Sequence, residues 1–417
     1  MSAGEQQSGA GGRRAAVIFN PVKQGVKQVA SALERLEPEH GYADTLWIET
    51  TEDDPGTGQA REAIDAGVDL VIAAGGDGTV RAIAEGLEDE DVPVGIIPLG
   101  TGNLFARNLG IPVNDIPGAV KLALTGRDRA VDVLRAKVRR EDGSTETEVS
   151  LVMSGIGIDA AMIANTDPDL KKRVGWLAYV DAGLRALPNS EPFRVAHRTD
   201  DGRAHRSRVS SILVANLGYL PGNIELIPDA EIDDGRLDVV RLQPRNFFEW
   251  LLVWRKVAWE NRVLRKSALG RQLIDLTGGN KRRELVYSSG AKIDIVIDGE
   301  PQEFEIDGED MGMITAARFV IDPKALVVRV SAQGGGRRPA GARQPAGAAP
   351  STPERASGRE PRDELATAEL DAAELEARKA MAAGPDADED ADADAPTTAE
   401  DAGADGDGDS GSGSADR

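Results

Sequence analysis

The chain has 417 residues and no cysteine, which excludes disulfide bonds, thiolate metal sites and a cysteine nucleophile. Its formal net charge is −22, and from residue 334 onward 20 acidic side chains outnumber 9 basic ones. Because the rest of the chain is also acidic, nucleic acid is not expected as a partner. The three histidines (His40, His197 and His205) lie in weakly patterned segments, which argues against histidine catalysis or a zinc site.

Residues 1–12 are small and polar, and we expect them to be disordered. They lack the apolar core of a signal peptide. No apolar run in the sequence reaches the length of a membrane-spanning helix. We therefore expect a cytoplasmic protein, with at most peripheral contact with the inner face of the membrane.

Residues 13–130 alternate buried strands with amphipathic helices. The predicted strands are 14–20, 42–49, 70–74 and 94–97, and helices are predicted at 24–36, at 58–66 and from residue 79. This order predicts an α/β domain with a doubly wound parallel sheet. Ligands of such sheets bind at the carboxyl ends of the strands.

The turn Gly75-Gly76-Asp77-Gly78-Thr79 follows the third predicted strand and opens a helix. Such a turn presents backbone N–H groups at the positive end of a helix, where phosphate binds well. An aspartate at a phosphate site is explained if a metal ion stands between the carboxylate and the phosphates. The plain alternative is a glycine-rich turn in which Asp77 caps the helix.

Three other polar segments stand near the same sheet edge: Asn20-Pro21, the PLGTGN segment at 98–103, and Asp132 at the start of the second part. Together with the GGDGT turn they supply amides, hydroxyls and two carboxylates, a set that suits nucleotide phosphates with Mg²⁺. Each segment alone is compatible with an ordinary turn. Their joint occurrence along one sheet favours a nucleotide site.

Residues 131–332 are predicted to be β-rich, with helical insertions at about 170–187 and 246–264. Both insertions combine aromatic with basic residues, and we favour helices that cover the domain core over direct membrane docking. The acidic tail, 333–417, is low in large apolar residues and is predicted to be disordered. Within it, 363–383 has helix-forming composition. The tail either binds an unknown partner or keeps the protein soluble.

Several motifs in chain order resemble those of the diacylglycerol kinase catalytic-domain family, which includes sphingosine and ceramide kinases. They are FNP (19–21), AAGGDGTV (73–80), PLGTGNLFARNLGIP (98–112), VDV (131–133), SGIGIDA (154–160), LIPDAEIDDGRLDVV (226–240) and EIDGE (305–309). The resemblance covers about residues 13–330. It implies a β-sandwich-like second domain and an ATP-dependent kinase that phosphorylates a hydroxyl of diacylglycerol or a related long-chain lipid at a membrane surface.

The resemblance also implies roles for single residues. The nucleotide site corresponds to Asn20, Gly75, Gly76, Asp77, Gly78, Thr79, Thr101 and Asn103. Asp77 and Asp132 match an aspartate pair that organises Mg²⁺ through water. Asp307, with Glu309 beside it, matches the base that takes the proton from the lipid hydroxyl, although Asp77 is the base in some relatives and the choice stays open.

Two further assignments carry alternatives. The first IDGE motif, with Asp298 and Glu300, competes with the second. The acidic group of Glu231, Asp233 and Asp234 matches a structural metal site of some relatives, or it is a solvated turn.

This chain departs from the family after GGDGT, where Arg81-Ala82 replaces the usual Asn-Glu. Arg81 either contacts phosphate or is a surface residue. The rival functions are a soluble-metabolite kinase similar to NAD kinases and a non-catalytic regulator that binds lipid or nucleotide. A homodimer is compatible with the sequence.

Overall fold

The computed structural model describes residues 12–43, 45–88, 90–157, 192–220, 224–225, 227, 230–242, 285–332 and 367–382. The helices predicted at 170–187 and 246–264 lie outside the described residues. Most of the low-complexity tail also lies outside them.

The first domain contains the expected parallel strands: β1 (Ala15–Phe19), β2 (Leu46–Glu49), β3 (Leu70–Gly75) and β4 (Val94–Pro98). They pair in the order β2-β1-β3-β4. β1, β3 and β4 are apolar along their whole length and fully buried, as strands of a sheet covered on both faces should be. The predicted doubly wound sheet is confirmed.

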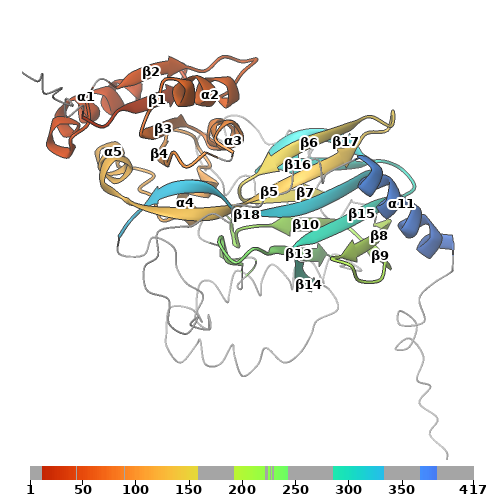
Figure 1. Cartoon of the computed structure of the whole chain (residues 1–417). Helices are drawn as coiled ribbons and strands as arrows, with labels where there is room; N and C mark the ends of the chain where they lie inside the picture. The colour runs from red at the N-terminus through yellow and green to blue at the C-terminus, as the bar shows by residue number, and fades with distance from the viewer. Residues whose placement is uncertain are drawn as a thin grey trace, which may run out of the picture.

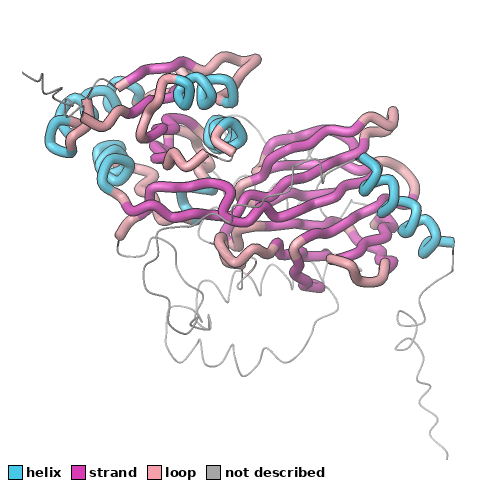
Figure 2. The backbone as a smooth tube through the Cα atoms, viewed as in Figure 1, coloured by secondary structure: helices cyan, strands magenta, loops and turns pink. Residues whose placement is uncertain are grey.

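Helices surround this sheet, as Figure 2 shows for the described part of the chain. They are α1 (Val26–Leu36), η1 (Pro38–His40), α2 (Thr57–Asp65), α3 (Asp77–Gly86), α4 (Leu104–Asn108) and α5 (Ile116–Thr125). They pack partly in pairs, α1 with α5 and α2 with α3. The helix predicted to follow the GGDGT turn is α3, so this turn does join a strand to a helix.

A long strand near the end of the fold, β18 (Ala316–Val330), joins the two domains. Its C-terminal part pairs in parallel with β4 at Val328 and Val94. It also pairs along its length with β5 (Arg127–Arg139), so the sheet continues without a break from the first domain into the second (Figure 1). The boundary predicted at residue 130 falls inside β5.

The second domain is a sandwich of two sheets. One is the continued sheet, with β6 (Thr145–Ser150), β8 (Phe193–Thr199), β9 (His205–Val209) and β15 (Lys292–Asp298). The other contains β7 (Met153–Ile156), β10 (Ser211–Ala215), β13 (Leu237–Leu242), β14 (Leu285–Gly290), β16 (Gln302–Ile306) and β17 (Glu309–Ile314). A short hairpin, β11 (Tyr219–Leu220) and β12 (Ile224–Glu225), stands apart from both sheets. The predicted β-sandwich is thus present.

Side chains from both sheets fill the space between them. Phe304 of β16 stacks near Phe319 of β18, with ring centroids 6.2 Å apart. Both side chains are fully buried, in one cluster with Ile156 and Ile295.

One described segment of the acidic tail is ordered as a helix, α11 (Thr367–Ala382). It lies within the segment 363–383 of helix-forming composition, and it packs on the second domain. Its Leu370 and Ala377 pack against β8, β15 and β18 of the second domain. Over these residues the expectation of a disordered tail is corrected, because a small apolar stripe finds a partner on the sheet. Among the described residues, no helix is both long and apolar enough to cross a membrane.

Candidate active site

Two glycine-rich turns touch at the carboxyl ends of β3 and β4. The Leu99 N–H donates to the Gly75 carbonyl at 2.8 Å. A Cβ atom on Gly100 would lie 2.7 Å from the Gly76 Cα atom and 2.8 Å from the Asn103 Oδ1 atom, closer than real side chains allow. Glycine is therefore required for the close approach. The sequence predicted this convergence of GGDGT with GTGN.

The residues of the two turns differ in how far they are exposed to solvent. Gly76, Asp77 and Gly78 are half-buried, and Thr101 is exposed, so these groups remain reachable. Thr79 is buried with its side chain packed against Gly75. The first N–H groups of an α-helix have no partner within the helix, so the start of α3 can donate to an anion.

Asp77 stands between the two turns at the first position of α3. Its Oδ1 atom accepts a hydrogen bond from the Phe105 N–H at 3.3 Å. A Cβ atom on Gly102 would lie 2.9 Å from its Oδ2 atom, so the carboxylate spans from one turn to the other. Burial raises the pKa of Asp77 to about 6; the Phe105 hydrogen bond opposes this, and the negative charge of Asp307 adds to it.

Asp307 comes from the second domain, in the turn between β16 and β17. Its Oδ1 atom accepts hydrogen bonds from the Ser150 hydroxyl at 3.0 Å and from the N–H groups of Val152 and Met153 at 2.9 and 3.0 Å. Its Oδ2 atom accepts from the Leu151 N–H at 3.0 Å. The residue is 8% exposed and has a φ of 51°, a strained backbone that these four bonds hold in place.

Glu309 begins β17 and reaches back to the first domain. It forms an ion pair with Arg81 of α3, and its carboxylate lies against Gly78. Arg81 also approaches the Met311 sulfur atom at 3.9 Å. Neither role considered for Arg81, phosphate contact or surface residue, describes this ion pair. The Arg81 side chain is 15% exposed and ties the helix after the GGDGT turn to the second domain.

The two predicted amides shape their own turns. The Asn20 Oδ1 atom accepts from the Val22 N–H at 3.1 Å. Asn103 has a φ of 48° and makes two hydrogen bonds with Gly100. Its Nδ2 atom donates to the Gly100 carbonyl at 2.7 Å, and its Oδ1 atom accepts from the Gly100 N–H at 3.0 Å. In this structure both amides therefore position the loops around the site.

Asp132 is fully buried, and its two carboxylate oxygens accept from the N–H groups of Gly235 and Lys324, each at 2.7 Å. Burial raises its pKa, those two hydrogen bonds lower it, and the charges of Asp234 and Asp233 raise it further. Asp132 thus lies beside the acidic segment, and the pair of Asp77 and Asp132 that would organise Mg²⁺ through water stays a prediction.

The acidic segment 231–234 is tied to its surroundings by an ion pair at 2.8 Å between Asp233 and Arg129. Burial raises the pKa of Asp234, its hydrogen bond with Arg236 opposes this, and the charge of Glu231 adds to the rise. Within the described part of the chain, no group of three or more carboxylates or histidines is arranged to hold a metal ion.

Comparisons with known proteins agree with this geometry. The family model described as the diacylglycerol kinase catalytic domain matches residues 14–136. A second, described as the YegS C-terminal NAD kinase β-sandwich-like domain, matches residues 150–330. A probable YegS-like lipid kinase of Pseudomonas syringae pv. tomato is 33% identical over 275 residues, which are 65% of this chain and 79% of that protein. The chain belongs to this lipid kinase family.

Two other proteins extend the comparison. A diacylglycerol kinase of Bacillus subtilis (strain 168) is 29% identical over 307 residues, which are 72% of this chain and 91% of that protein. The crystal structure of a putative diacylglycerol kinase from Bacillus anthracis str. Sterne superposes with a TM-score of 0.60. It is 23% identical in sequence and covers 78% of this chain and 99% of its own, so the two share a fold.

Of the two IDGE motifs, the second lies beside the GGDGT turn. Its Glu309 pairs with Arg81 and lies against Gly78, and the charge of Asp307 contributes to the raised pKa of Asp77. Asp298 of the first motif instead pairs with Arg194 at 3.1 Å, at the far end of the second domain.

Sequence reasoning missed the groups that hold Asp307 and Glu309. Three donors to Asp307 are backbone N–H groups, which leave no signature in the sequence. The Arg81 contact was signalled by an arginine two residues after GGDGT, where the family usually has asparagine. Pairing it with Glu309 requires knowing that the two domains meet there.

Proposed function

We propose that this chain is an ATP-dependent kinase that transfers the γ-phosphate to a hydroxyl of diacylglycerol or a related long-chain lipid. One observation carries the proposal: Asp77 stands between two glycine-rich turns in contact, and Glu309 from the second domain lies against Gly78 of the same turn. A phosphate-binding edge and a carboxylate from another domain meet at one place, as phosphoryl transfer between two substrates requires.

The GGDGT and GTGN turns are proposed to bind the nucleotide phosphates through their backbone. ATP supplies the phosphoryl group, and Mg²⁺ neutralises the charge that develops during transfer. Mg²⁺ commonly keeps several waters and uses one or two carboxylates, so Asp77 could hold it through water without a larger acidic cluster.

We assign the proton-accepting role to Asp77 and a positioning role to Asp307. Asp77 is half-buried, and its pKa of about 6 suits proton transfer near neutral pH. Asp307 is more deeply buried and is held by four donors. Its negative charge raises the pKa of Asp77, so it tunes the proton acceptor from the second domain.

Transfer of labelled γ-phosphate to diacylglycerol, sphingosine, ceramide and NAD, offered in parallel, tests this function. We expect labelled lipid from the wild-type protein and none from Asp77→Asn. Label in NAD alone would move the chain to the soluble-metabolite kinases. ATP binding with no product from any acceptor would favour a non-catalytic regulator and would contradict the proposal.

A further inference from the structure

The outer side of the continued sheet, facing away from the sandwich core, is strongly basic. Val195, Ile295 and Phe319 point into the core, so the residues that alternate with them point outward. The outward-facing basic residues on β5, β8, β9 and β18 are Lys137, Arg139, Arg194, Arg198, Arg206, Arg208 and Arg318. Asp294 of β15 pairs with Arg198 and Arg318, and Asp298 pairs with Arg194, so the face keeps a net positive charge but part of it is neutralised within the sheet. We call this surface the basic face.

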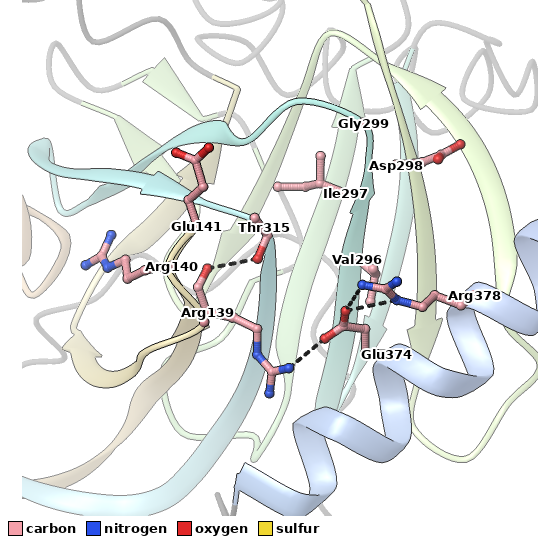
Figure 3. A pocket seen from close by; sticks show the side chains of 11 residues that line it. Arg139, Arg140, Glu141, Val296, Ile297, Asp298, Gly299, Thr315, Glu374 and Arg378 are labelled. Atoms are coloured by element: carbon pink, nitrogen blue, oxygen red, sulfur yellow. Dashed lines mark hydrogen bonds and ion pairs between the residues drawn. The ribbon is translucent and has the colours of Figure 1, made fainter.

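The acidic helix α11 lies on the basic face (Figure 1). Its Glu369 pairs with Arg318, and its Asp371 and Glu374 both pair with Arg139. Figure 3 shows Glu374 between Arg139 and Arg378. A hydrogen bond with Lys379 lowers the pKa of Glu376, and the charge of Arg198 lowers it slightly further. Charge complementarity therefore places this helix on the sheet.

The apolar part of the contact is small. Leu370 and Ala377 of α11 sit on Ala196, Val296 and Ala316, and only the leucine is a large side chain. A cavity of about 510 Å³ remains beside the helix, lined by Arg139, Val296, Thr315 and Glu374 among others. Partly exposed ion pairs contribute little to stability each. A different, densely negative surface can therefore compete with α11 for the basic face.

We propose that the basic face is a docking surface for an anionic lipid bilayer and that α11 covers it in competition with the bilayer. The face is broad, with arginines spread over several strands, and so it matches an extended layer of phosphates. Each basic residue near an anionic membrane adds to the binding affinity. The chain outside this face is acidic overall, which disfavours a partner such as nucleic acid that would contact more of the surface.

Vesicle sedimentation of the full-length chain tests the proposal independently of kinase activity. One variant neutralises the helix: Glu369→Gln, Asp371→Asn, Glu374→Gln and Glu376→Gln. We expect its binding to phosphatidylcholine vesicles with about 30% phosphatidylglycerol to exceed that of the wild type about 10-fold. Binding to pure phosphatidylcholine should stay at background, and about 0.5 M NaCl should remove the gain.

Matched variants show where the gain arises. Adding Arg139→Gln, Arg194→Gln and Arg208→Gln to the neutralised helix should return binding to the wild-type level. Adding Arg35→Gln, Arg61→Gln and Lys121→Gln, exposed residues of the first domain, should leave the gain intact. A further control changes four acidic residues near the C-terminus to asparagine: Asp401, Asp405, Asp407 and Asp409.

Three outcomes would overturn the proposal. The first is unchanged vesicle binding when α11 is neutralised. The second is an equal gain from the C-terminal control, which would make net charge the cause. The third is a gain that survives the three arginine changes, or that appears with duplex DNA and not with vesicles. Thermal unfolding of each variant confirms that the compared proteins are folded.

Discussion

The raised pKa of Asp77 suits a proton acceptor but lowers the stability of the folded protein at neutral pH. Burial raises its pKa from 3.8 to about 6, so the folded protein favours the neutral carboxyl group. The ionised form that prevails at neutral pH is therefore less stable in the folded state than in the unfolded chain. The penalty is absent below pH 3.8 and grows as the pH rises through 6.

Asp77→Asn should therefore stabilise the protein at about pH 8 by about 1–3 kcal/mol. Asparagine keeps an oxygen that can accept from the Phe105 N–H and removes the buried charge. Urea unfolding without Mg²⁺ at about pH 8 and about pH 4 measures the effect, and the gain should nearly vanish at the lower pH. A gain of the same size at both pH values would show that buried charge is not its source.

The contact between the turns after β3 and β4 depends on their glycines. Gly100→Ala would place a Cβ atom 2.7 Å from the Gly76 Cα atom and force the turns apart. We expect ATP affinity to fall about 10-fold or more, since phosphate groups would lose part of their backbone donors. Isothermal titration calorimetry measures this change.

Gly143→Ala is the matched control for Gly100→Ala. Gly143 lies between β5 and β6, and no atom lies within 4 Å of the new Cβ position. Its φ of 85° makes alanine strained there too, so the control carries a backbone cost without a clash between turns. Equal loss of ATP affinity in both variants would rule out the turn contact as the cause.

The ion pair between α3 and β17 links two elements from different domains. We expect the Arg81→Gln and Glu309→Gln changes to be non-additive in unfolding free energy, with a coupling of about 0.5–1 kcal/mol. Glu309 is 52% exposed, which limits the strength of the pair. Urea unfolding of the two single variants and the double variant measures the coupling.

A second cycle, between Arg81 and Asp201, supplies the control. Asp201 pairs with Lys292 at 2.9 Å within the second domain and has no contact partner in common with Arg81, so it should show no coupling to Arg81. Additive effects for Arg81 and Glu309 would show that the contact contributes nothing between the domains.

At the scale of the whole molecule, the sequence predicted the elements better than their long-range partners. Hydrophobic periodicity indicated the parallel strands, and the glycine turns followed at their carboxyl ends. The pairing of β18 with β4 could not be predicted, because a buried apolar strand fits several neighbours equally well. The docking of α11 was missed for a similar reason: its small apolar stripe carries meaning only beside the basic face.

The site shows the same limit. Asp77, Asp132 and Asp307 were each indicated by a motif, but the groups around them were not. Asp132, for example, accepts from two backbone N–H groups that leave no signature in the sequence. Motifs report which residue types are present, whereas the neighbours of a carboxylate depend on how two domains pack.

The most direct test of the central claim compares turnover and ATP binding in one variant. Diacylglycerol phosphorylation by Asp77→Asn should fall about 10²-fold or more, because the proton acceptor is lost, while the ATP dissociation constant changes by less than about 3-fold. That split would place Asp77 in the chemical step of a lipid kinase. Wild-type turnover in the variant, or loss of ATP binding equal to the loss of turnover, would contradict the account.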